Sequence, residues 1–121
     1  MPSLIESHIR DDQINVTISA GQAITAEIDT GGKRLARIAI PASWTTANIT
    51  FQVAPISGGT FTDLYDSGGT EYNVTVGGAS RTIIIPLADM IGLRFIKIRS
   101  GTTGTPVNQA ADRILAIATC S

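Results

Sequence analysis

The segment that decides the fold is residues 48–53, Asn-Ile-Thr-Phe-Gln-Val, in which apolar and polar side chains alternate. A β-strand places successive side chains on opposite faces, so this alternation predicts a strand with one buried and one exposed face. The same pattern recurs at residues 14–18, 24–29 and 71–76. Such repetition within one chain predicts sheets whose inner faces pack together, as in an antiparallel β-sandwich.

Four further segments are richer in apolar residues, namely 35–40, 82–85, 95–99 and 114–118. We expect these to be central strands, or strands that a partner covers on their second face. Glycine-containing turns separate the segments, and glycine tolerates the backbone angles that tight turns require. Strands at roughly 8–12-residue spacing indicate an all-β sandwich or barrel of about eight strands.

Helix is nearly absent from this pattern. Residues 86–91, Pro-Leu-Ala-Asp-Met-Ile, predict one helical turn that proline opens and Gly92 ends. Residues 1–13 lack the alternation, so we expect an extended N-terminal arm followed by a single sandwich domain at residues 14–121. Leu4, Ile5 and Ile9 are the candidate assembly contacts of this arm.

Composition limits the classes of function. The net charge is −1, and the densest cations, Lys33-Arg34 and those at residues 94–99, are too few for nucleic-acid binding. No apolar run approaches the roughly 20 residues of a membrane helix, and residues 1–13 do not resemble a secretory signal. We therefore expect a protein made in the cytoplasm, with no membrane partner. Cys120 is the only cysteine, so no internal disulfide can form.

No catalytic site is evident, and we expect no enzyme activity, cofactor or metal. His8 is the only histidine and falls in the expected arm, where a general base would be poorly held. Cys120 has no neighbouring base that would activate it. Asp63 and Asp66 are an alternative calcium pair, but the glycines after Asp66 favour a turn in which its carboxylate bonds the backbone.

Trp44 is the remaining candidate for ligand binding. Its ring either stacks on a sugar or folds over the edge of the sandwich as a lid, and the sequence favours the lid. The other aromatic residues are explained by core positions in the expected strands.

Longer phrases of the sequence resemble a known group of proteins. These are residues 50–54, the run Gly-Gly-Thr-Phe-Thr-Asp-Leu-Tyr-Asp at 58–66, Gly-Leu-Arg-Phe-Ile-Lys-Ile-Arg-Ser-Gly-Thr at 92–102, and Pro-Val-Asn-Gln-Ala-Ala-Asp-Arg at 106–113. Together they resemble small virion proteins of tailed bacteriophages and prophages. The run at 92–98 also looks like the late strands of discoidin-like jelly rolls, many of which bind carbohydrate. The chain lacks the loop aromatics and the disulfide typical of those domains.

The resemblance implies a virion structural protein made in the bacterial host cytoplasm. We expect a capsid decoration (cement) protein or head-spike-base subunit that binds the major capsid protein or another virion protein. Such small subunits bind more tightly when symmetric copies make repeated contacts, and a homotrimer is favoured. The alternative is a tail accessory or a host-adsorption module that binds carbohydrate.

Overall fold

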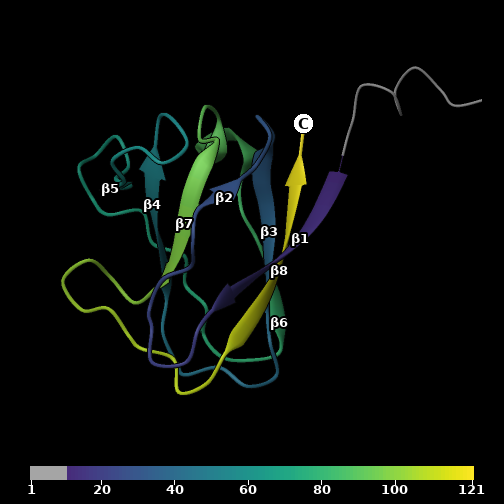
Figure 1. Ribbon diagram of the computed structural model, residues 1–121, viewed down its shortest axis with the longest axis vertical. Coiled ribbons are helices and arrows are strands. Elements are labelled where there is room, and N and C mark those ends of the chain that lie inside the picture. Colours follow the sequence, from purple (N-terminus) through teal and green to yellow (C-terminus); the bar gives the residue numbers. More distant parts are fainter. Residues whose placement is uncertain (1–10) are drawn as a thin grey trace, which may run out of the picture.

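The computed structural model describes residues 11–121 as two packed antiparallel sheets of four strands each. Figure 1 shows β4, β7 and β2 of one layer at the left and β3, β1, β8 and β6 of the other at the right. Sheet A has the strand order β1-β8-β3-β6 and sheet B the order β2-β7-β4-β5. The elements are β1 (Asp11–Ile18), β2 (Ile28–Asp29), β3 (Arg34–Ile40), β4 (Ile49–Ala54), β5 (Thr62–Asp63), β6 (Arg81–Ile84), the short helix η1 (Leu87–Met90), β7 (Phe95–Ser100) and β8 (Arg113–Cys120). The predicted all-β sandwich is confirmed.

The strand pairing is nested. β1 pairs with β8, β2 with β7, β3 with β6 and β4 with β5, all antiparallel. This is the arrangement of one long hairpin folded over into two sheets. The additional pair β3–β8 completes sheet A, and the pair β4–β7 completes sheet B. An eight-stranded double-sheet sandwich of this kind is a jelly roll.

The core fills the space between the sheets with the apolar halves of the alternating strands. Ile38 and Ile117 from sheet A and Phe51 and Ile98 from sheet B are each at most 1% exposed. Trp44 and Met90 close the core at its margins. Most of the positions that the alternation assigns to the inside are therefore inside.

Some strand boundaries differ from the expectation. β1 begins at Asp11, so residues 11–13 belong to the sheet and not to an arm. Pairing with β8, in the register Asp11↔Cys120 to Gln13↔Ala118, supplies the backbone partners that polar side chains alone do not predict. The rest of the expected arm, with Leu4, Ile5, His8 and Ile9, lies outside the described residues.

The alternation at residues 71–76 does not produce a strand. Val74 forms only an isolated bridge with Ile49, and the N–H of Val76 donates to the side chain of Asn48 at 3.2 Å. A side-chain acceptor thus replaces the next rung of a ladder, although Val74 and Val76 are buried as the pattern predicts. Residues 24–29 likewise form only β2 and a bridge from Ile24 to Arg99.

Three of the apolar-rich segments, β3, β7 and β8, are central strands as expected. The fourth, β6, is an edge strand, and its Ile84 is 81% exposed. The helical turn expected at residues 86–91 is confirmed as η1.

Candidate functional site

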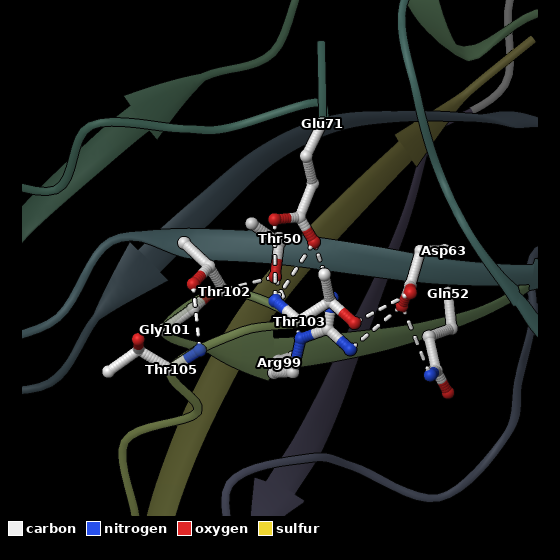
Figure 2. A network of polar contacts seen from close by, with 9 residues as sticks. All are labelled: Thr50, Gln52, Asp63, Glu71, Arg99, Gly101, Thr102, Thr103 and Thr105. Carbon is white, nitrogen blue, oxygen red and sulfur yellow. Dashed lines mark hydrogen bonds and ion pairs between the residues drawn. The ribbon is translucent and has the colours of Figure 1, made fainter. Parts of the chain in front are cut away.

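The outer face of sheet B carries a buried arginine. Ile96 and Ile98 of β7 point into the core, so Arg99 lies on the opposite face, paired in register with Thr50 of β4. Its side chain is nevertheless only 6% exposed, because the segments around Asp63 and Glu71 and the loop at residues 101–105 cover it. Figure 2 shows these side chains converging on the guanidinium.

Each nitrogen of the Arg99 guanidinium has a partner. Nη1 donates to Asp63 Oδ1 at 2.9 Å, Nη2 to Glu71 Oε2 at 2.6 Å, and Nε to Thr50 Oγ1 at 2.9 Å (Figure 2). The Thr50 hydroxyl in turn donates to the carbonyl of Gly101 at 2.7 Å. Because each guanidinium nitrogen has an acceptor and two carboxylates face the charge, this arginine is tolerated where an unpaired charge would not be.

Thr103 ties both carboxylates to the loop at residues 101–105. Its hydroxyl donates to Asp63 Oδ2 at 2.7 Å, and its N–H donates to Glu71 Oε2 at 3.1 Å. The Thr103 hydroxyl, with smaller contributions from Arg99 and Gln52, holds the pKa of Asp63 below its usual value although burial acts in the opposite direction. The network therefore fixes two loops to the sheet, and its acceptors and donors are already used within the chain.

The outer face of sheet A is different. Its two central strands present small side chains there, with Ala116 and Ala118 of β8 next to Ala39 and Arg37 of β3. Two isoleucines on the same face are largely exposed, Ile84 at 81% and Ile114 at 56%. A shallow hollow of about 350 Å³ lies between Arg37, Ile84 and Ala118. This face also carries Gln13, Asn15 and Thr17 of β1, so it mixes apolar with polar side chains, and its larger side chains are exposed.

A groove runs along the open side of the sandwich, where β1 and β2 form the edges of their sheets. Its volume is about 510 Å³, and β1 lines one wall while residues 24–29 line the other. Ile14 and Val16 are half-buried on the first wall, and Ile24 is half-buried on the second. The groove is thus apolar at its base and bordered by strand backbone.

Trp44 is buried rather than offered to solvent. It is 9% exposed, packs in the core, and donates from its indole N–H to the carbonyl of Ala47 at 3.2 Å. This arrangement matches the lid role and leaves the ring little surface on which a sugar could stack.

Tyr65 is the aromatic residue that the structure presents instead. It is 50% exposed and borders a shallow cleft of about 260 Å³ with Asp66, Tyr72 and Asp89. The Tyr72 hydroxyl donates to Asp89 at 2.7 Å, and burial, reinforced by Asp89, raises the pKa of Tyr72 to about 12. This hydroxyl therefore remains a hydrogen-bond donor over the physiological range.

Asp66 and Asp63 do not converge. Asp66 accepts from the backbone N–H groups of Gly68 and Thr70 at 2.9 and 3.0 Å, as the turn interpretation predicts. Asp63 pairs with Arg99 instead. Within residues 11–121, no group of three or more histidine, cysteine, aspartate or glutamate side chains is placed to hold a metal ion. Nor does any helix of this part of the chain have the length and apolar character needed to cross a membrane.

The cations that the sequence marks as densest are engaged locally. Lys33 pairs with Asp12, Arg94 with Asp29, and Arg99 with Asp63 and Glu71. Lys97 lies over the ring of Phe61, with Nζ 4.4 Å from the ring centroid. Their positive charge is therefore largely matched within the fold.

Sequence reasoning missed both the arginine network and the groove. One signal for the network was present, since Arg99 and Thr50 are polar residues that alternate with the apolar core positions of β7 and β4. The partners Asp63 and Glu71 are 36 and 28 residues distant in sequence, so their convergence depends on the topology. Comparison with known proteins yielded no match to a protein family, to a curated protein or to a solved structure.

Proposed function

We propose that this chain is a structural protein of a bacteriophage virion, a capsid decoration or head-spike-base subunit, that attaches through the outer face of sheet A. The observation that carries the proposal is the exposure of Ile84 and Ile114 on a face that also carries Ala39, Ala116 and Ala118 beside polar side chains of β1 and β3. Exposed apolar side chains on the same face of a sheet are compatible with a protein–protein contact site. Jelly rolls are common in viral capsid proteins, although the fold alone carries no function.

The shape of this face supports attachment rather than ligand binding. Alanines along β3 and β8 allow a partner surface to approach closely, and Arg37 supplies one polar contact amid them. An oligomeric subunit on a capsid also gains avidity from multivalent binding, so each individual contact can be small.

The test is binding to assembled capsids of the phage that encodes the chain, purified without it. We expect saturable binding of the oligomeric protein, and loss of at least tenfold in affinity when Ile84→Glu and Ile114→Glu are combined. Ile56→Glu is the matched control, because Ile56 is 64% exposed but lies in the loop that follows β4. A monomeric protein that does not bind these capsids would contradict the proposal.

The Tyr65 cleft supports the second candidate, a host-adsorption module that binds carbohydrate. An exposed aromatic ring beside Asp66 and Asp89 offers a stacking surface together with hydrogen-bond acceptors. This candidate predicts binding on a glycan array that Tyr65→Ala abolishes and Ile56→Ala preserves. An array without hits would exclude it.

A further inference from the structure

The edges of the two sheets differ greatly in length. β2 and β5 have two residues each and β6 has four, whereas β1 has eight. Among the described strands, β1 pairs only with β8, so the backbone groups along its other side face the groove. A long unpaired edge is a template for a further strand, and proteins normally shorten or cover such edges.

The groove beside β1 suits an extended segment with apolar and basic side chains. Ile14, Val16, Ile24 and Ile28 provide the apolar surface. Glu27 and Asp29 are the ionisable side chains of the lining. Hydrogen bonds from Ser57 and Gly58 lower the pKa of Glu27, and Arg94 lowers that of Asp29, so both are ionised at neutral pH.

We propose that this groove receives residues 4–10 of a second copy of the chain as an added strand paired with β1. In the sequence Leu-Ile-Glu-Ser-His-Ile-Arg, the alternate residues Ile5, Ser7 and Ile9 would share the face toward the groove. This inference rests on the proposed function only in assuming that the protein is an oligomer, and it adds how the copies associate.

Charge sets the direction of the added strand. Lys33, four residues after Asp29, pairs with Asp12 near the beginning of β1, so Asp29 lies toward that end of the groove. An added strand antiparallel to β1 would carry Arg10 to that same end, beside a carboxylate. The opposite direction would place Arg10 away from Asp29.

A second copy is favoured over the same chain by turn chemistry. Asp11 is already paired with Cys120, so residues 4–10 could reach their own β1 only through a tight hairpin at about residues 9–10. Two-residue hairpin turns need residues such as Asn and Gly that tolerate positive φ, and Ile9-Arg10 provides neither. Exchange between copies avoids this turn, and a head-to-tail exchange closes into a ring of defined size.

Disulfide trapping in the full-length chain tests the proposal. In a Cys120→Ser background, Ser7→Cys is mixed with an equal amount of Ala26→Cys, an exposed residue of the groove lining. We expect a cross-linked heterodimer to form at least tenfold faster than in the control mixture with Thr82→Cys, an exposed residue on β6. The chain that carries both Ser7→Cys and Ala26→Cys should give covalent oligomers up to a closed ring.

Two results would overturn the inference. One is cross-linking to Ala26→Cys no faster than to Thr82→Cys, and the other is a link formed within a single chain. As an independent measurement, Ile5→Asp with Ile9→Asp should lower the oligomer mass in sedimentation without lowering the melting temperature. If cross-linking fails while capsid binding persists, the strand exchange is wrong and the proposed function stands.

Discussion

The two sheets of this sandwich treat their outer faces in opposite ways. Sheet B buries a charged side chain, Arg99, whose partners are Asp63 of β5, Glu71 of a loop and the hydroxyl of Thr50 on β4. Sheet A leaves its outer face open and lines it with alanine, arginine and two exposed isoleucines. Loops therefore stabilise the outer face of sheet B, while the outer face of sheet A remains available for contacts with other proteins.

The largest expected effect is the loss of the charge that organises sheet B. Arg99→Met leaves Asp63 and Glu71 close together without their common cation, at side-chain exposures of 24% and 15%. We expect the free energy of unfolding in urea to fall by about 3–5 kcal/mol. Arg94→Met is the matched control, because its pair with Asp29 is exposed and contributes about 0–1 kcal/mol. Equal losses of unfolding free energy in the two variants would show that the buried ion pairs of Arg99 contribute no more than the exposed pair of Arg94.

A smaller effect is expected at the turn below the network. Gly101 has φ +90°, and a Cβ there would lie 2.4 Å from the carbonyl oxygen of Thr105. Gly101→Ala should therefore cost roughly 1–3 kcal/mol through backbone strain and displacement of the loop. Gly104→Ala, where a Cβ meets nothing within 4 Å, is the control on the same loop. A stable Gly101→Ala variant would show that this loop is not held as described.

Acid should weaken sheet B selectively. The folded-state pKa of Asp63 lies below its usual value near 3.8, so its contribution is complete above that value and is lost as the pH falls through the folded pKa. The stability difference between the parent chain and Asp63→Asn should thus be constant above about pH 5 and shrink below about pH 4. Urea titrations across this range measure it. A difference that grows on acidification would contradict the assigned hydrogen bonds.

The smallest effect on stability is expected on sheet A. Ile84→Glu alters a side chain that is 81% exposed, so the unfolding free energy should change by no more than about 0.5 kcal/mol. Capsid binding should respond instead. A large loss of stability would mean that Ile84 contributes to the fold and that the open face is not reserved for partners.

The architecture was largely predictable from the sequence, because period-two alternation depends only on which side of a strand each residue occupies. The helical turn η1 and the turn at Asp66 were predictable from other local signals, namely Pro86 and Gly92 for the first and the glycines after Asp66 for the second. Residues 71–76 were not, since the Asn48 side chain takes the N–H that would continue the ladder. β1 was predicted too short, because its first residues are polar on both faces and are held by β8.

The surfaces could be predicted much less well. The exposure of Ile84 follows from the position of β6 at an edge, and strand order is not contained in the alternation. The Arg99 network joins residues from distant segments, and the β1 groove exists only because β1 and β2 belong to different sheets. Such features depend on the topology, which the hydrophobic pattern of the sequence does not determine.

The nested pairing also has a consequence for biosynthesis. β8 lies between β1 and β3, so sheet A remains incomplete until residues 113–120 have left the ribosome. Until then β1 lacks β8, the strand with which it pairs, and its apolar side chains remain exposed. Because the chain must bring distant segments together, folding on the slow millisecond-to-second scale of all-β proteins is expected.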